Sequence, residues 1–205
     1  MVERVSPRYI LAMNRVSPAL ISAIGIGVIL MAILVGPLFS PLEFSWIHHT
    51  TSEQASQQLP GAWIMRVGFV AYGLSTLLAA MVVSRTLPFV RGALIVFGIG
   101  LVGTAIWSNA SILPGVPSDM HEDWLHSVAS GIVGTAFAVA CAARLFLPGG
   151  SKRDVLAWVG LVISVAVPLA MGAWPEGRGM LQRAMFGFSF VFVAREFKAL
   201  GRMLD

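Results

Sequence analysis

Residues 18–38 read PALISAIGIGVILMAILVGPL, a stretch of 21 positions without one charged side chain. A helix of about 20 residues spans the roughly 30 Å hydrocarbon core of a bilayer. The apolar residues surround the helix instead of alternating as in a strand, which excludes a transmembrane β-barrel. Ser17 suits an N-cap and Pro18 the first helical position. The stretch therefore predicts a transmembrane helix that begins at Pro18 and is too long for the apolar core of a cleaved signal peptide.

Five more apolar segments of similar length follow, and the composition of the chain agrees with them. Of its 205 residues 57% are hydrophobic and only 12% are charged, and its mean hydropathy is +0.80. A soluble domain carries about 25% charged residues, so water is not the main solvent of this surface. The sequence predicts an all-α fold, a single domain over residues 1–205 that forms a polytopic membrane bundle. Six transmembrane helices surrounded by membrane lipids are expected at about 18–38, 62–83, 90–107, 125–147, 155–174 and 180–197.

Basic residues gather on one side of this topology. With the N-terminus in the cytoplasm, the inner segments hold 11 of the 14 lysine and arginine residues. These are Arg4, Arg8, Arg15, Arg85, Arg91, Arg144, Lys152, Arg153, Arg195, Lys198 and Arg202. By the positive-inside rule both termini are cytoplasmic, and the two long loops, residues 40–61 and 109–124, lie outside. Since this topology accounts for the net charge of +4, nucleic acid is not an expected partner.

All four histidines, His48, His49, His121 and His126, fall in or beside these two outer loops. A haem-b cytochrome needs facing histidines inside its helices, so no haem is expected. An ion-coupled transporter needs ionisable residues near the centre of its spans, and the sequence places none there. A cluster of titratable, metal-capable groups at one mouth of the bundle is therefore the main candidate for chemistry.

The second outer loop ends in DMHEDWLH at residues 119–126. If a helix begins near Asp119, its three acids and His126 share one face by i, i+3, i+4 and i+7 spacing. Such a set can ligate zinc or supply Asp123 as a general acid or base. The alternative is an acidic helix cap beside a surface histidine. His121 and His126 diverge by about 140° on a helix, unlike the i, i+4 pair of a typical zinc helix.

The first outer loop contains HHTTSEQ at residues 48–54. One of its histidines, together with His126 and an acid, would complete a three-ligand metal site with an open water position. The alternative is a solvated loop with Ser52 as a helix N-cap, in which Thr51 or Ser52 begins a short helix through Gln58. Arg66 and Arg183 stand about one turn inside the outer ends of their helices. They either snorkel to lipid headgroups or point inward, to pair with loop acids or to bind an anionic headgroup.

Small residues recur on the predicted fourth helix, in the spacings Ser127-x-x-x-Gly131 and Ser130-x-x-x-Gly134. Such spacings let helix backbones approach closely in lipid. We expect them to pack against neighbouring helices of the same chain.

Three short motifs resemble one bacterial family. They are HTTSEQ at residues 49–54 followed by PGAW at 60–63, the Pro- and Asp-rich loop that ends in Leu125-His126, and GMLQR at 179–183. The family is the group of six-helix membrane proteins called domain of unknown function 998, and the resemblance spans nearly the whole chain. It implies a multi-pass protein of the bacterial inner membrane, with the long loops extracytoplasmic, and no particular reaction.

More distantly, the chain resembles membrane hydrolases in which Ser, Asp and His surround a zinc ion at one membrane face. On that analogy Asp119 and His126, with His121 or His49, would hold zinc. Ser52 or Glu53 would orient the attacking water. Two hypotheses follow: a metal-assisted hydrolase that acts on a lipid-like substrate at the extracytoplasmic face, or a non-catalytic accessory or structural subunit of a larger membrane complex.

Overall fold

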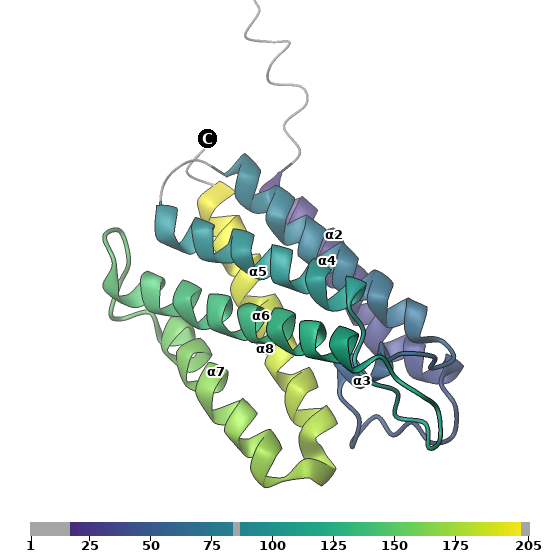
Figure 1. Cartoon of the computed structure of the whole chain (residues 1–205). Helices are drawn as coiled ribbons and strands as arrows, with labels where there is room; N and C mark the ends of the chain where they lie inside the picture. Colours follow the sequence, from purple (N-terminus) through teal and green to yellow (C-terminus); the bar gives the residue numbers. More distant parts are fainter. Residues whose placement is uncertain (1–16, 84–86, 202–205) are drawn as a thin grey trace, which may run out of the picture.

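The computed structural model describes residues 17–83 and 87–201, and these ranges contain helices and loops but no strand (Figure 1). The predicted all-α class is confirmed. Within these ranges the α-helices are α2 (Pro18–Val35), α3 (Thr51–Gln54), α4 (Ala62–Val82), α5 (Pro88–Ile106), α6 (Met120–Phe146), α7 (Val155–Ala173) and α8 (Arg178–Gly201). Two short 3-10 turns, η1 (Gly36–Phe39) and η2 (Pro175–Gly177), follow α2 and precede α8.

The long helices form one bundle in which chain neighbours pack side by side. The order is α2, α4, α5, α6, α7 and α8, and α8 also packs on α2, so the bundle closes on itself (Figure 1). One end, which we call the loop end, holds residues 36–61 and 107–119 with α3. The opposite end, which we call the terminal end, holds Pro18, the turn at residues 148–154 and the end of α8.

Helix starts are set by capping side chains. Asp119 accepts hydrogen bonds from the backbone N–H groups of His121 and Glu122 at 2.8 and 3.2 Å. Because of this cap, α6 begins at Met120, five residues before the predicted start at 125. Asp154 caps α7 in the same way, by accepting from the N–H of Ala157 at 3.0 Å. An N-cap side chain of this kind stabilises a helix by about 1 kcal/mol.

Two other predicted starts have different outcomes. Pro18 is the first residue of α2 as predicted, although the Ser17 side chain makes no capping bond. The short loop helix is capped by Thr50 instead of Ser52 and ends at Gln54 instead of Gln58. The reason is a capping box, in which Thr50 and Glu53 satisfy each other's backbone N–H groups.

Glycines bring α4 and α5 together but leave one side of α6 open. A Cβ on Gly73 of α4 would lie 2.7 Å from the carbonyl oxygen of Gly98 on α5, so only glycine permits this approach. A Cβ on Gly131 or Gly134 of α6 would meet no atom within 4 Å. The predicted packing role of these two α6 glycines is wrong. Close α6–α7 contact occurs further along the helix, at Gly160, where a Cβ would lie 2.6 Å from Cys141 Sγ.

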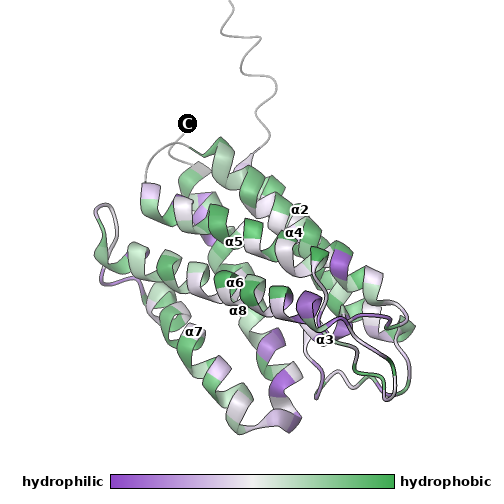
Figure 2. Ribbon diagram, viewed as in Figure 1, coloured by the Kyte–Doolittle hydropathy of each residue, from purple (hydrophilic) through white to green (hydrophobic). Residues whose placement is uncertain are grey.

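Within the described ranges, five segments are long and apolar enough to cross a membrane, by length and composition. They are α2 with η1, α4, α5, α6 and α7. Figure 2 shows apolar residues along most of their length and polar residues gathered near α3, at the start of α6 and on α8. The chain is thus a candidate multi-pass membrane protein whose exposed apolar side chains suit contact with lipid. The predicted sixth span, residues 180–197, lies in α8 and stays a prediction.

The sidedness prediction rests partly on residues outside the described ranges. These include both terminal segments and the basic residues Arg4, Arg8, Arg15, Arg85 and Arg202.

Candidate functional site

Residues 50–58, which we call the hub segment, connect the loop end to several helices. This polar run is buried from residue 50 to residue 57, apart from half-buried Ser52. A buried segment needs a partner for every backbone polar group. The capping box supplies some of these partners. The Glu53 N–H donates to Thr50 Oγ1 at 3.1 Å, and the Thr50 N–H donates to Glu53 Oε2 at 2.8 Å.

The hub segment is tied to α8 by two glutamine contacts. Gln182 Oε1 accepts from the N–H and the hydroxyl of Thr51 at 2.7 and 2.6 Å. Gln54 accepts from Arg183 at 3.1 Å through its oxygen, while its amide nitrogen donates to the carbonyl of Ala32 in α2 at 3.0 Å. Arg178 pairs with the other oxygen of Glu53. Two of the predicted site residues, Glu53 and Arg183, therefore hold the loop end on α8, and Gln54 holds it on α2.

Arg183 points into the bundle and is only 7% exposed. Its Nη1 donates to the carbonyl oxygens of Trp46, His49 and Gly179 at 2.7, 2.6 and 3.0 Å. The guanidinium also lies 4.7 Å from the centroid of the Trp46 ring. Of the two predicted orientations, the inward one is observed. Its partners are backbone carbonyls in place of the expected loop acids, and these contacts already use most of its donors.

Arg66 plays a similar part on α4. Its Nε and Nη2 donate to the carbonyl oxygens of Ala55 and Ser56 at 3.0 and 3.1 Å. The fork of an arginine suits two adjacent carbonyls, so this side chain fixes the end of the hub segment. Both arginines predicted to bind a headgroup thus hold the loop backbone.

Gln57 joins the two long loops. Its amide nitrogen donates to the carbonyl oxygens of Ser108 and Asp119 at 3.1 and 2.9 Å, and its oxygen accepts from the Asp119 N–H at 2.7 Å. The exposed Gln58 donates to the carbonyl of Pro117 at 2.7 Å. The loops are in direct contact, as a shared site requires, but the contact is made by glutamines and not by the histidines.

The acids near the start of α6 hold loop backbone. Glu122 Oε1 accepts from the Ser108 N–H and Asp123 Oδ1 from the Ala110 N–H, both at 2.7 Å. Asp119 is the helix cap described above. All three carboxylates predicted here as ligands or catalysts therefore have backbone partners.

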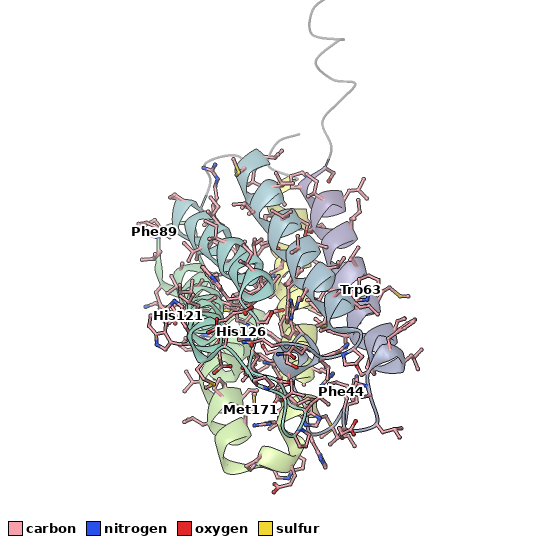
Figure 3. The ribbon with its side chains drawn as sticks, turned by 45° about the vertical axis from the view of Figure 1, so that its right-hand side comes forward. Phe44, Trp63, Phe89, His121, His126 and Met171 are labelled. Atoms are coloured by element: carbon pink, nitrogen blue, oxygen red, sulfur yellow. The ribbon has the colours of Figure 1, made fainter. Side chains whose placement is uncertain are left out.

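The histidines occupy separate environments. The Nδ1 of His49 accepts from the Ser45 N–H at 2.8 Å, and its ring stacks on Phe44 at a centroid distance of 5.5 Å. Burial lowers the pKa of His49 below its ordinary 6.5, the charge of Glu53 opposes this, and the charge of Arg178 adds to it. His121 is exposed and stacks on Trp124. Figure 3 shows His121 at the outside of the bundle and His126 inside it.

The predicted zinc site does not fit these positions. Across residues 17–83 and 87–201, no group of three or more His, Cys, Asp or Glu side chains is placed to hold a metal ion. One of the predicted ligands also has its neutral-imidazole lone pair engaged, since His49 Nδ1 accepts from the Ser45 N–H. His49, Asp119, His121 and His126 are not brought together, so we derive no chemistry through zinc.

His126 differs from the other three because it is buried and half satisfied. It is 3% exposed, and its Nδ1 lies 2.8 Å from the carbonyl oxygen of Trp107. A carbonyl only accepts, so Nδ1 carries the proton and Nε2 is left as an acceptor. In the part of the chain that the structure describes, Nε2 is buried without a hydrogen-bond partner.

A cavity of about 480 Å³ lies among α4, α5, α6, α7 and α8, on the inner side of the hub segment. Its walls are mainly apolar, with Phe97, Phe137 and Phe186 among them, and its polar groups include Ser52, Ser130 and Gln182. Among the described residues that line it there is no ionisable side chain. The size and the few polar groups are those of a small-molecule pocket.

The cavity reaches the surface of the bundle between α6 and α7. Gly131 and Thr135 of α6 and Pro168 of α7 line it and are exposed. This opening lies along two candidate membrane spans, α6 and α7. Ser52 is the one predicted site residue that lines it. The sequence signal that marks the cavity is the Ser and Gly spacing on α6, which predicts helix packing instead.

Comparison with known proteins shows the family of the chain. A family model described as "Protein of unknown function (DUF998)" matches residues 23–194. The chain belongs to this family. The matched residues include the hub segment and the whole lining of the cavity. No curated protein and no solved structure matches the chain.

The terminal end of this DUF998 protein carries a network of four charges that the sequence did not reveal. Arg144 approaches Asp154 and Glu196 at 3.2 and 3.6 Å, and Arg195 approaches the same two acids at 2.6 Å each. These contacts join α6, the cap of α7 and α8. Burial alone would raise the pKa of Asp154, but hydrogen bonds from Arg195 and the Ala157 N–H lower it. From the sequence, the basic residues of this network predict only the topology.

Proposed function

We propose that this protein binds an uncharged, lipid-like molecule in the cavity among α4 to α8, which the ligand enters from the membrane between α6 and α7. The observation that carries the proposal is the cavity of about 480 Å³ with exposed edges on two candidate membrane spans. Apolar walls favour an acyl or isoprenoid chain, since burial of apolar surface contributes about 25 cal/mol per Å².

The lining supports a neutral ligand. A buried charge needs a partner of opposite charge, and the described lining residues supply only hydroxyl and amide groups. Gln182 and Ser52 stand at the loop end of the cavity and Ser130 lies on its α6 wall. These groups suit an uncharged head that forms hydrogen bonds.

Binding without hydrolysis is the better supported activity. A hydrolase needs a general base or a metal-bound water near the scissile bond. The carboxylates predicted for catalysis, Glu53 and Asp123, and the predicted zinc ligand Asp119 all accept hydrogen bonds from backbone N–H groups. A role as an accessory subunit has no observation of its own in its favour, because lipid covers the exposed face of α7 as well as a partner would.

Substitution of Gly134 tests the cavity. A Cβ there meets no atom within 4 Å and the residue lines the cavity, so Gly134→Leu fills the space without a backbone clash. Gly27→Leu on α2 is the matched control, since that position is equally open and does not line the cavity. Both changes raise helix propensity by about the same amount.

The probe is 1-mono-oleoylglycerol, and its binding to the purified protein is measured by native mass spectrometry. We expect Gly134→Leu to weaken binding at least about tenfold, since filling the cavity removes the buried contact area, and Gly27→Leu to leave it unchanged. Equal binding by wild type and both variants, or no binding by the wild type, would contradict the proposal.

We further propose that α8 is the sixth span, in the cytoplasmic membrane of a bacterial cell, with the terminal end in the cytoplasm. The support is the basic residues of the terminal end, such as Arg144, Lys152 and Arg195. Gln58 and Lys152 are exposed at opposite ends, and Cys141 is buried. In intact cells a membrane-impermeant maleimide should label Gln58→Cys and not Lys152→Cys, and the reverse pattern would contradict this orientation.

A further inference from the structure

We propose that His126 Nε2 and the Ser130 hydroxyl form the head-group site of the cavity, and that the ligand is a neutral lipid with a hydroxyl group on its head. This inference rests on the proposed function, because it names the ligand class of the same cavity. The expected ligands are acylglycerols with a free hydroxyl group or long-chain alcohols. Hydrocarbons and simple esters, which have no hydroxyl donor, are not expected.

The first observation is a pair of unsatisfied polar atoms. His126 Nε2 and Ser130 Oγ are both buried and have no hydrogen-bond partner among the residues that the structure describes. Nearly all buried polar atoms in folded proteins have such a partner, and an exception often marks a binding or catalytic role.

The second observation is that these atoms belong together. His126 and Ser130 are four residues apart on α6, so their side chains lie on the same face, one turn from each other. Ser130 lines the cavity, and His126, which is not itself among the lining residues, lies one turn closer to the loop end. Ser52 and Gln182, which also line the cavity, come from α3 and from the first two turns of α8, both at the loop end. Other polar groups line the middle of the cavity, but the Ser164 and Ser189 hydroxyls already donate to the carbonyls of Gly160 and Phe186.

The third observation is the tautomer of His126. Its Nδ1–H donates to the Trp107 carbonyl, which fixes the ring, and in the neutral imidazole Nε2 is then the acceptor. An acceptor requires a donor from the ligand, and a Ser130 hydroxyl can donate to the ligand oxygen at the same time. A hydroxyl group meets both requirements, whereas an ester or ketone oxygen meets only the second.

Two chain-matched probes test this assignment: 1-mono-oleoylglycerol, which has hydroxyl donors, and methyl oleate, which has none. We expect the wild type to bind the first about tenfold more tightly, as one or two buried hydrogen bonds imply. His126→Asn keeps an amide near the Nδ1 position for Trp107 and has no atom at the Nε2 position. His126→Asn and Ser130→Ala should each reduce the preference to about twofold or less while leaving methyl oleate binding unchanged.

His126→Gln is the rescue variant, because its longer amide places a polar atom near the Nε2 position and should restore part of the preference. Thermal unfolding of each variant checks that it is folded, and Ser130→Ala carries the test if His126→Asn is not.

The outcomes separate the two proposals. If the wild type binds neither probe, the proposed function fails, and this inference fails with it. If the wild type binds both probes equally, the cavity still binds lipid and only the head-group assignment is overturned. If folded His126→Asn and Ser130→Ala both keep the full preference, the assignment is likewise overturned.

Discussion

The two ends of the bundle are held together by different chemistry. At the loop end, side chains such as Gln57, Arg66 and Arg183 donate to backbone carbonyls. At the terminal end, Arg144 and Arg195 pair with Asp154 and Glu196. Carbonyls do not titrate and carry no net charge, so most contacts of the loop end are independent of pH and salt. The network at the terminal end depends on two carboxylates that remain ionised.

The largest expected effect comes from Arg183 at the loop end. Arg183→Met keeps the length of the side chain and removes donors from three backbone carbonyls and from Gln54. We expect the free energy of unfolding to fall by about 3–5 kcal/mol, because those acceptors stay buried without partners. Thermal unfolding in detergent measures it.

Arg178→Met is the control for this prediction, since the Arg178 side chain is 42% exposed and its pair with Glu53 is worth less than about 1 kcal/mol. Equal losses in the two variants would show that burial of Arg183 is not what holds the loop end.

A near-isosteric change at Gln57 should be almost as damaging. Gln57→Glu replaces the donor to the carbonyls of Ser108 and Asp119 by a buried oxygen that repels them. A loss of about 2–3 kcal/mol is expected from the two unpaired carbonyls. Gln58→Glu, at the exposed neighbouring position, should cost less than about 0.5 kcal/mol. Hydrogen exchange should show faster opening of both long loops in Gln57→Glu, and unchanged exchange in the second loop would contradict the proposed link.

A substitution of Glu196 tests the charge network at the terminal end. Glu196→Gln removes the charge that pairs with Arg144 and Arg195, both of which keep Asp154. We expect a loss of about 1–2 kcal/mol that shrinks as salt is raised.

The loop-end counterpart of this variant is Glu122→Gln, whose partner is the neutral Ser108 N–H and whose amide oxygen can still accept from it. Its effect on the unfolding midpoint should not depend on salt. The same salt dependence in both variants would show that the two ends do not differ as described.

Acid should loosen the loop end first, through one histidine. Because the pKa of His49 is lowered, the folded protein binds a proton there less readily than the unfolded chain. The free energy of unfolding therefore falls as the pH drops through 6.5, by about 1 kcal/mol for one lost hydrogen bond from Ser45. The pKa of Asp154 is lowered from 3.8, so its contribution is present above that pH and is lost only in stronger acid.

Thermal unfolding between pH 7 and about pH 5 measures the loss of stability caused by His49, because Asp154 stays ionised in this range. His49→Asn keeps an acceptor for the Ser45 N–H and does not titrate, so its unfolding midpoint should stay constant over this range. A wild-type midpoint that also stays constant would refute the role of His49.

Local signals in the sequence were reliable where they depend on a few neighbouring residues. Asp119 was recognised as a residue that could begin a helix, and it is the cap of α6. The glutamines Gln54, Gln57 and Gln182 carried no such signal, because an amide can form a hydrogen bond with any backbone group within reach. Their partners, such as Ala32 and Ser108, lie 22 and 51 positions from Gln54 and Gln57.

By itself the sequence determined the helical class, five candidate membrane spans and the family, since apolar runs and short motifs are properties of consecutive residues. Only the tertiary structure decided what the polar residues do. It buried Arg183 among carbonyls, separated the histidines and left Nε2 of His126 without a partner. It also left Gly131 and Gly134 facing open space, which makes the cavity. The physical reason is that a side chain's role depends on the groups within about 3 Å of it, and packing of distant segments sets those groups.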